Sequence, residues 1–457
     1  MALAAGLVLT LTACVEKVEQ VEAPAATGVD GGDAANADLA ADLMGGDLAG
    51  GLPVVERFPG ADVSFGTLPD APEAADPDAE PIKIGMINQE DTPLGSFPEL
   101  RLADEAGVAF INTELGGVGG RPIELVPCIT TFSPEKSQAC AQQLVQDGVV
   151  AVLGGIDITS TGSIPVLDQN AMPYVGGIPI NADEMTSPYS FQFGGGTPGA
   201  FVAFAEHAAD EGAQKVAVAY ADFGPIKSAA VDYGVGVLEA RGVTDVVEIP
   251  FPITTTDFLP VLTAAAEGDP DAIFLVAADS ACAPAMTTAA DLGITADLYL
   301  VGACAAPTIA DEVGEAAVEG RIFNIEGPIS GEDVEGQVYL AVVGTYGDPD
   351  LAAAGAGTVS FRSLMNLYAL LEELGPDDIS PASITEALRA TEDQPSFNGH
   401  AYTCDGRQIP ALPAMCSPQE ILVVRRDGAL APLTDWIDVP AIVAETGIAQ
   451  TPPTGGG

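Results

Sequence analysis

Beginning at residue 81, short runs of β-branched and apolar residues alternate with stretches in which apolar residues recur at helical spacing. The short runs predict strands at 82–87, 122–127, 149–153, 215–220, 246–250, 272–277 and 298–301. The longer stretches predict helices at 99–115, 134–147, 199–211, 226–241, 258–267, 282–292 and 358–375. Unbroken apolar strands followed by helices are typical of parallel sheets that are covered on both faces, so an α/β fold is expected.

The alternation falls into two blocks with the same order of elements, about 81–195 and 199–322. Between them lies a run with the composition of a hinge, Gly194-Gly195-Gly196-Thr197-Pro198-Gly199. The chain of 457 residues is long enough for two lobes of ordinary domain size. We therefore expect two doubly wound parallel-sheet lobes, the first from 81–196 and 327–400 and the second from 197–326. Residues 401–457 are expected to form a tail with a disulfide loop, which returns through the hinge toward the first lobe.

The first 14 residues have the pattern of an export signal. Residues 1–13, MALAAGLVLTLTA, are too short for a membrane-spanning helix and end in small residues. The next residue is Cys14, and the run Leu11-Thr12-Ala13-Cys14 resembles a bacterial lipobox. This resemblance implies removal of the signal and a lipid anchor on Cys14, whereas the alternative is a buried apolar strand with an incidental cysteine. No later run reaches the ~18 apolar residues of a membrane span. We expect an exported protein that is lipid-anchored to the outer face of the cell membrane.

Residues 15–80 are rich in Ala, Gly, Asp and Pro and contain few bulky apolar residues. Such a segment cannot bury enough apolar surface to offset the entropy of ordering it. The sequence therefore predicts a disordered acidic tether between the lipid and the folded lobes.

The chain carries 66 acidic against 15 basic residues, a formal net charge of −51. This balance argues against electrostatic binding of nucleic acid or of an anionic membrane surface. One interpretation of the charge is capture of a cationic solute. The other, which we favour because the acidic residues run along the whole chain, is a surface adapted to high salt.

Six cysteines remain after Cys14, and an even number in an exported chain indicates disulfides. Proximity in sequence favours the pairs Cys128 with Cys140, Cys282 with Cys304 and Cys404 with Cys416, although six cysteines allow roughly 15 connectivities. The alternative is a metal site, but the chain has no CxxC motif and only two distant histidines, His207 and His400. Neither a metal nor a cofactor is expected.

Residues 109–112 (AFIN) and 114–125 (ELGGVGGRPIEL) are similar to the signature of periplasmic receptors for branched-chain amino acids and amides. In this motif a helix ends in a glycine turn that leads into the second strand of the sheet. The resemblance covers about residues 81–430 and implies a type I periplasmic-binding fold, in which two lobes joined by three crossings close on a solute. It also implies a small-molecule ligand, an ABC permease in the membrane as partner, and a monomer.

The resemblance places the ligand at loops that follow parallel strands, where open α/β sheets hold their ligands. The loop at 154–161 resembles the family's Gly- and Ser-rich loop and offers Asp157, Thr159 and Ser160, whose hydroxyls and N–H groups would hold an anion such as a carboxylate. The alternative role for Thr159 and Ser160 is to cap a helix. The loop at 177–186 offers Asn181, where the family usually has Thr or Ser. Phe97 is expected to close the cleft from the first lobe.

In the second lobe the resemblance makes Phe223 an aromatic cover over the ligand, with packing inside the lobe as the alternative. Amino-acid receptors of the family place an acid in the loop after the strand at 298–301, but this chain has Cys304 there. Asp279, followed by Ser280, is the candidate to replace that acid. The expected solutes are therefore a branched-chain amino acid, an amide or a related carboxylate, with a larger amphiphile as a further option.

An enzyme is the second class of function to be weighed. The sequence contains no GxSxG, HExxH or P-loop motif, and neither histidine has an evident nucleophile as partner. We therefore expect a binding protein. A receptor that senses its ligand and signals to a membrane partner has the same fold and remains the alternative to a transport receptor.

Overall fold

The computed structural model describes residues 52–92, 95–277, 279–329, 333–347, 351 and 355–448. The predicted export signal, the anchor residue Cys14 and residues 15–51 of the predicted tether lie outside these ranges. Within them, no helix combines the length and the apolar character that a membrane span requires.

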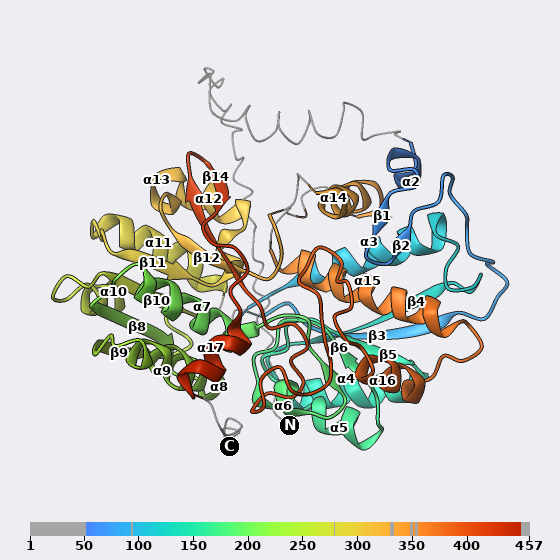
Figure 1. The fold of residues 1–457 in the computed structure, drawn as a ribbon, viewed down its shortest axis with the longest axis horizontal. Helices are drawn as coiled ribbons and strands as arrows, with labels where there is room; N and C mark the ends of the chain where they lie inside the picture. Colours follow the sequence, from blue (N-terminus) through green and yellow to red (C-terminus); the bar gives the residue numbers. More distant parts are fainter. Residues whose placement is uncertain are drawn as a thin grey trace, which may run out of the picture. The chain divides into compact units, whose positions relative to one another are not determined.

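The first lobe is built on a five-stranded sheet whose strands are all parallel (Figure 1). The strand order is β4 (Ile123–Thr130), β3 (Ile82–Gln89), β5 (Ala151–Gly154), β6 (Tyr174–Val175) and β7 (Ser190–Phe191). Ile84 and Met86 of β3 belong to one apolar core and Ile87 to another. The sheet therefore buries both of its faces, as the unbroken apolar run at 82–87 predicts.

Helices from distant parts of the chain cover these two faces. One core joins β3 to α3 (Pro98–Glu114), α14 (Val334–Tyr346) and α15 (Ala356–Leu374), and α16 (Pro381–Arg389) packs on α15. The other core joins the sheet to α4 (Pro134–Asp147) and α5 (Ile164–Gln169). Helix α4 begins where Ser133 accepts a hydrogen bond from the Lys136 N–H at 3.2 Å and ends at Gly148, whose φ is 73°.

The second lobe contains a seven-stranded sheet. Its parallel part has the order β9 (Asp245–Phe251), β8 (Lys215–Ala221), β10 (Ala272–Val276), β11 (Asp297–Leu300) and β12 (Ile322–Ile325). One group of helices comprises α7 (Gly196–Asp210), α9 (Gly236–Ala240) and α17 (Val439–Thr446), and another comprises α10 (Leu259–Ala265), α11 (Cys282–Asp291), α12 (Pro307–Val313) and α13 (Glu315–Val318). The helix predicted at 226–241 is divided into α8 (Gly224–Ser228), a π-helical segment η1 (Ala229–Val235) and α9.

The tail does not simply return to the first lobe, as the sequence had suggested. Strands β13 (Ile421–Arg426) and β14 (Ala429–Pro432) extend the second sheet in antiparallel fashion beside β12. Asp427 and Gly428 connect them with φ values of 53° and 79°, the two left-handed positions of a tight hairpin turn. This pairing supplies partners for the polar backbone groups at the edge of β12, which would otherwise lack them.

The tether prediction is wrong for residues 52–80. Val54 and Val55, in α2 (Val54–Arg57), are fully buried, and their N–H groups donate to the Glu114 carboxylate at 2.9 and 2.8 Å. A short hairpin of β1 (Asp62–Val63) and β2 (Gly66–Thr67) follows, and the Phe65 ring packs 5.7 Å from the Phe397 ring. The few apolar residues of this segment find a partner surface on the first lobe, which its average composition did not reveal.

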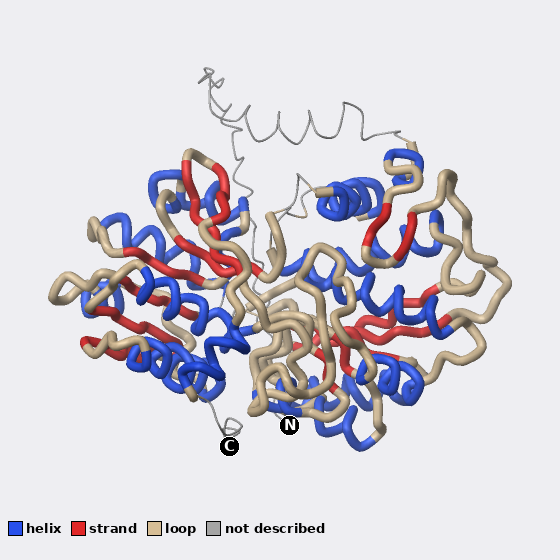
Figure 2. Tube along the Cα trace, in the orientation of Figure 1, coloured by secondary structure: helices blue, strands red, loops and turns tan. Residues whose placement is uncertain are grey.

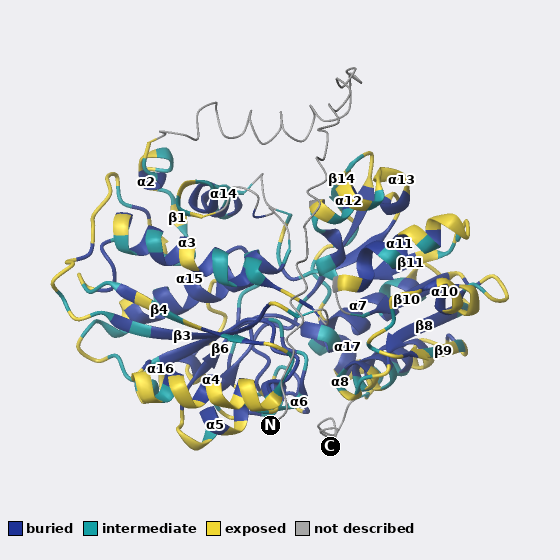
Figure 3. Cartoon of the chain, turned by 180° about the vertical axis from the view of Figure 1, so that it is seen from behind, coloured by how far each residue is buried: buried dark blue, intermediate teal, exposed yellow. Residues whose placement is uncertain are grey.

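The chain passes between the lobes three times, after β7, after β12 and before β13, mainly as loops (Figure 2). Figure 3 shows that the strands of both sheets are buried and that exposed residues gather on the outer helices and loops. The three predicted disulfides are present, Cys128–Cys140, Cys282–Cys304 and Cys404–Cys416.

Candidate functional site

Two adjoining cavities lie at the carboxyl ends of the parallel strands, lined by residues of both lobes. The first, which we call the inner cavity, has a volume of about 150 Å³. Its wall is mainly aliphatic: Ile156, Ile158, Ile178, Ile180, Ile226, Ile253, Val276, Val301, Ile325 and Val359 all contribute to it. Such a wall suits an apolar group, because apolar surface removed from water stabilises a complex by about 25 cal/mol per Å².

The second, which we call the outer cavity, has a volume of about 420 Å³ and shares Ile158 and Ile180 with the inner one. Its wall is more polar and includes Thr159, Asn181 and Asp183 from the first lobe. Asp222, Phe223 and Tyr233 come from the second lobe. The two cavities together form a cleft with one mainly apolar part and one more polar part.

The shared isoleucines come from two loops with the same local sequence. Residues 154–158 read GGIDI and residues 176–180 read GGIPI, and each loop follows a strand of the first sheet. The Ile178 N–H donates to the Gly155 carbonyl at 3.1 Å, so the loops are joined directly. This repeated pattern is visible in the sequence and was missed as a sign of an apolar binding surface.

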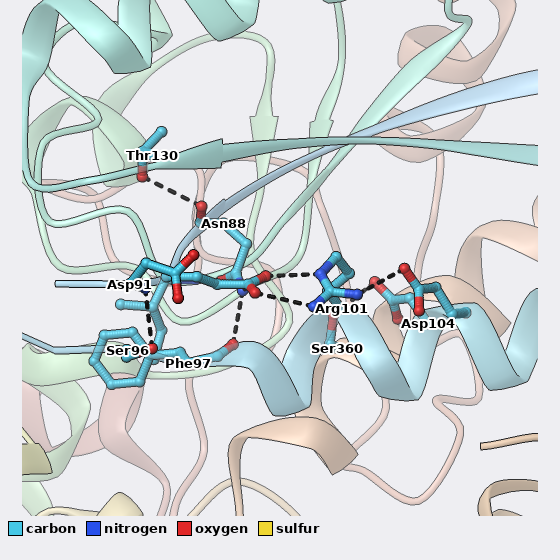
Figure 4. Close-up of polar contacts among 11 residues, drawn as sticks. Asn88, Asp91, Ser96, Phe97, Arg101, Asp104, Thr130 and Ser360 are labelled. Atoms are coloured by element: carbon cyan, nitrogen blue, oxygen red, sulfur yellow. Dashed lines mark hydrogen bonds and ion pairs between the residues drawn. The ribbon is translucent and has the colours of Figure 1, made fainter. Parts of the chain in front are cut away.

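Asn88 is a buried positioning residue that the sequence analysis also missed. It is fully buried at the end of β3, and its side-chain Nδ2 donates to the Phe97 carbonyl at 2.7 Å (Figure 4). Its Oδ1 accepts from the Ile156 N–H at 3.1 Å. A Cβ on Gly155 would lie 2.3 Å from that oxygen, so the close approach requires glycine. One amide thus positions Phe97 and Ile156, which both line the inner cavity.

The start of α3 is fixed beside this amide. Arg101 donates from Nε and Nη2 to the two carboxylate oxygens of Glu90, at 2.8 and 3.0 Å. This bidentate pair raises the pKa of Arg101, so the guanidinium stays charged. The pair holds the first turn of α3, and with it Phe97 just ahead of the helix, against the end of β3.

Asp157 lies behind the wall of the outer cavity instead of lining it. It is fully buried, and its carboxylate accepts from Ser137 Oγ at 2.5 Å, from Thr159 Oγ1 at 2.9 Å, from the Thr159 N–H at 3.1 Å and from Thr130 Oγ1 at 3.2 Å. Burial raises the pKa of Asp157, and these hydrogen bonds act in the opposite direction. Both oxygens of Asp157 already accept hydrogen bonds from the protein. We therefore assign Asp157 a structural role in place of the predicted contact with the ligand.

Asn181 and Ser160 join the two loops. Asn181 Nδ2 donates to the Ile158 carbonyl at 3.0 Å and to Ser160 Oγ at 2.8 Å. The carboxyl group of Glu184 accepts the N–H groups of Ile180 and Asn181, both at 2.9 Å, in a capping box at the start of α6 (Ala182–Thr186). Burial raises the pKa of Glu184 to about 8. Ser160 is fully buried and lines neither cavity, whereas Asn181 lines the outer one.

The structure brings four of the eight predicted site residues to the cleft. Phe97 lines the inner cavity, and Thr159, Asn181 and Phe223 line the outer one. Ser280 belongs to the short 3-10 helix Asp279–Ala281, is exposed and lines neither cavity, and the assignment of Asp279 to the ligand stays a prediction. The second lobe contributes Val276 at the end of β10, Ala277 directly after it, and Val301 to Ala303 after β11.

A buried charged cluster lies where the crossings meet. Glu326 accepts from the Gly196 N–H at 3.0 Å, and the Arg362 guanidinium lies 3.5 Å from its carboxylate and donates to its backbone carbonyl. Glu420 accepts from Asn324 Nδ2 at 3.1 Å. Burial raises the pKa values of Glu326 and Glu420 and lowers that of Arg362.

The glycine run of the predicted hinge packs against this cluster. A Cβ on Gly194 would lie 2.1 Å from Glu326 Oε2, and one on Gly195 would lie 2.2 Å from Glu420 Oε1. The run therefore provides close approach to the two carboxyl groups as well as a change of chain direction. The charged cluster joins all three crossings, because Gly194, Glu326 and Glu420 each belong to a different one.

Two lobes with ligand-sized cavities at the ends of their parallel strands define a solute-binding protein. Residues 81–415 match the family model described as "Periplasmic binding protein", and the chain belongs to this family. Its members are solute-binding receptors and not enzymes, so membership implies a small-molecule ligand and an extracytoplasmic location.

Solved structures show the same fold at low sequence identity. A leucine-binding protein from Thermotoga maritima matches with a TM-score of 0.64 and 20% identity over 78% of this chain and 98% of that one. An ABC-transporter solute-binding protein from R. palustris, in complex with 4-hydroxybenzoate, gives 0.65 and 21% over 79% and 98%. A fatty-acid ABC-transporter substrate-binding protein from Thermomonospora curvata gives 0.62 and 16% over 81% and 96%. No curated protein sequence matched the chain.

Proposed function

We propose that this protein captures a small solute with an apolar body in the two cavities and delivers it to an ABC permease. The observation that carries the proposal is the continuous aliphatic wall of the inner cavity, to which both lobes contribute. A solute that contacts both lobes stabilises the closed arrangement more than the open one, and it therefore shifts the equilibrium toward closure. The closed form is the one that docks on the permease.

The first lobe contributes two loops that hydrogen bonds hold together. Its loops at 154–161 and 177–186 are joined by the Asn181 amide and by the hydrogen bond between Ile178 and Gly155. The second lobe brings Phe223 and Val301 to the opposite wall. We infer that the solute binds first to the loops of the first lobe and that Phe223 then covers the outer cavity on closure.

Branched-chain amino acids, amides and carboxylates with apolar bodies all have a part that fits the inner cavity. The similar solved structures are a leucine-binding protein, a solute-binding protein in complex with 4-hydroxybenzoate and a fatty-acid transporter substrate-binding protein. Each of these compounds has a polar head on an apolar body, and the inner cavity complements the body.

We also propose that the protein acts as a monomer on the outer face of the membrane, held by a lipid on Cys14. The lipobox-like run at 11–14 supports this attachment. Labelling with radioactive palmitate in cells should mark the wild-type chain and leave a Cys14→Ala variant unlabelled. Labelling of both forms would contradict the anchor.

The test of the receptor function is a thermal-shift screen in high salt on the chain with Cys14→Ser. A ligand that binds the native state at 100 times its Kd stabilises it by about 2.7 kcal/mol and raises the melting temperature. The panel contains amino acids, amides, carboxylates, amines and sugars. A saturable shift with apolar-bodied compounds supports the proposal, and a shift with sugars alone refutes it. Binding together with chemical turnover would contradict the receptor function.

A sensing receptor remains the second candidate, because the same closure can signal to a membrane partner. Neighbouring genes discriminate the two functions, since permease and ATPase genes indicate transport and a kinase gene indicates sensing.

A further inference from the structure

The charged cluster at the crossings contains one basic group and two acidic ones. Arg362, Glu326 and Glu420 are all buried, and they are the charged groups that act on one another there. With both carboxyl groups ionised, one positive charge faces two negative charges out of contact with water. A buried charge without compensation is strongly unfavourable, and a buried acid in that position keeps its proton. The cluster becomes neutral when one of its two carboxyl groups is protonated.

The two carboxyl groups differ in how well their charge is compensated. Arg362 Nη2 lies 3.5 Å from Glu326 Oε2, and the Gly196 N–H donates to Glu326 Oε1 at 3.0 Å. Glu420 Oε2 accepts from Asn324 Nδ2 at 3.1 Å, whereas its Oε1 has no hydrogen-bond partner among the described residues. Burial, together with the nearby charge of Glu326, raises the pKa of Glu420 well above its ordinary value. Glu420 is therefore the better place for the proton.

The charged cluster also reaches the wall of the inner cavity. Asn324, which donates to Glu420, accepts the Gly302 N–H through its Oδ1 at 3.0 Å. Gly302, Asn324, Glu326 and Gly196 all line that cavity. Hydrogen bonds thus join both carboxyl groups to the surface that a solute contacts.

Closure of the lobes and burial of the cluster depend on the same three crossings. Gly194, Glu326 and Glu420 belong to different crossings, so a change in the angle between the lobes changes the packing around the two carboxyl groups. Water that reaches Glu420 in an open arrangement relieves the desolvation that raises its pKa. Asp157 and Glu184, two other buried acids near the cleft, lack this link, because their hydrogen-bond partners among the described residues all belong to the first lobe.

We propose that closure of this protein on its solute takes up a proton, which Glu420 holds in the charged cluster. This inference rests on the receptor function proposed above and adds a form of regulation to it. The sign follows from linkage, because a proton that binds the closed form more tightly than the open form favours closure. Solute affinity is therefore highest below the pKa that Glu420 has in the open form. It falls as the pH rises toward the higher pKa of the closed form.

Isothermal titration calorimetry with leucine and with 4-hydroxybenzoate, between pH 5.5 and 8 in high salt, tests this linkage. The affinity of the wild-type chain should fall about tenfold over this range. Glu420→Gln has the shape of the neutral acid but cannot ionise, so at pH 8 it should bind about as tightly as the wild type does at pH 5.5. Glu386→Gln, at an exposed position of α16, is the matched control and should follow the wild type.

A purely structural role of Glu420 predicts the opposite result at pH 8, weaker binding by Glu420→Gln than by the wild type. That result would overturn the inference, as would a wild-type affinity that does not change with pH. Glu326→Gln provides an independent variant, because it leaves Arg362 and Glu420 as a neutral ion pair. This variant should also lose the pH dependence of binding.

If neither compound binds, small-angle X-ray scattering of the solute-free chain decides. The radius of gyration should decrease more between pH 8 and pH 5.5 in the wild type than in Glu420→Gln, since only the wild type gains the proton that favours closure. Equal changes in the two chains would overturn the inference. Failure of the receptor function has a different signature, which is the absence of any shift across the whole thermal-shift screen.

Discussion

The two lobes have the same kind of sheet but very different interiors. The first lobe buries polar and charged side chains deep inside, among them Asn88, Asp104, Glu114, Asp157 and Glu184. Among the described residues of the second lobe, the buried polar side chains are Arg321, Asn324 and Glu326, with Glu420 and Arg425 from the returning tail, all close to the pairing of β12 with β13. The rest of its core is hydrocarbon and aromatic.

This difference shows two ways of fixing a binding wall. In the first lobe, buried hydrogen bonds set the positions of the loops at 154–161 and 177–186. In the second lobe, the Cys282–Cys304 disulfide joins the start of α11, after β10, to the 3-10 helix Gly302–Ala305, after β11. A covalent link fixes the two loops that reach the inner cavity where few polar side chains are available to do so.

The largest effect is expected from removing the centre of the polar network in the first lobe. Asp157→Ala leaves the donors of Thr130, Ser137 and Thr159 without their acceptor, at a cost of about 4 kcal/mol in the free energy of unfolding. Urea denaturation measures this loss, and Thr161→Ala, on the exposed part of the same loop, is the matched control. A loss below about 1 kcal/mol would show that Asp157 does not organise the loop.

Removing the covalent link of the second lobe should have the next largest effect. The double variant Cys282→Ala with Cys304→Ala opens a loop with a sequence separation of 22 residues, so we expect a loss of about 3 kcal/mol. Solute affinity should also fall, because Val301 and Ala303 of the inner cavity border this link. Calorimetry and chemical denaturation report the two effects separately. The corresponding variant of Cys404–Cys416, a pair that does not line the cavities, should lose stability with little change in affinity.

A substitution of Asn88 tests whether its side-chain amide positions residues of the inner cavity wall, separately from its effect on global stability. Asn88→Ala removes the hydrogen bonds to the Phe97 carbonyl and from the Ile156 N–H, and we expect a destabilisation of about 2 kcal/mol. Solute affinity should fall about tenfold, because both residues line the inner cavity. Asn170→Ala, at the end of α5, loses a hydrogen bond far from the cavities and provides the control. An unchanged affinity in Asn88→Ala would remove Asn88 from the site.

The smallest expected change in the free energy of unfolding, when it is expressed per pH unit, comes from the buried carboxyl group of Asp104. Burial raises its pKa from the ordinary value to about 8, with Ser360 Oγ donating to it at 2.7 Å (Figure 4). Because the folded pKa lies above the unfolded one, its contribution to stability is complete below about pH 4 and is lost as the pH rises toward 8. Asp104→Asn should flatten the stability profile between pH 5 and 8 by about 1 kcal/mol per pH unit. Asp291→Asn on the second lobe should leave the profile unchanged, and an equal flattening by that variant would refute the assignment.

Much of the fold could be predicted from the sequence because its signals are local. The unbroken apolar runs identify β3, β8 and β10, and Ser133-Pro134 with Gly148 bounds α4. Cysteines close in sequence were correctly paired. The antiparallel extension by β13 and β14 was missed even though Asp427-Gly428 is a recognisable hairpin turn, because the segment was interpreted by its Pro and Gly content.

The sequence indicated which loops form the candidate site, but it could not indicate which partners each side chain in those loops contacts. Thr159, Asn181, Phe223 and Phe97 were assigned to the cleft and line its cavities. Asp157 was given to the ligand because its sequence position cannot show that Ser137 and Thr130, 20 and 27 residues earlier, donate to it. The paired GGIDI and GGIPI loops were the readable signal of an apolar wall.

By itself, the sequence determined the alternation of strands and helices, the division into two lobes and the disulfide pairs. These features depend on periodicity and spacing, which act over a few residues or turns. Only the tertiary structure decided that residues 52–80 pack on the first lobe, that residues 421–432 complete the second sheet, and that the cleft has an aliphatic wall. The physical reason is that each of these depends on which distant partner is available to a buried group, and folding alone brings those partners together.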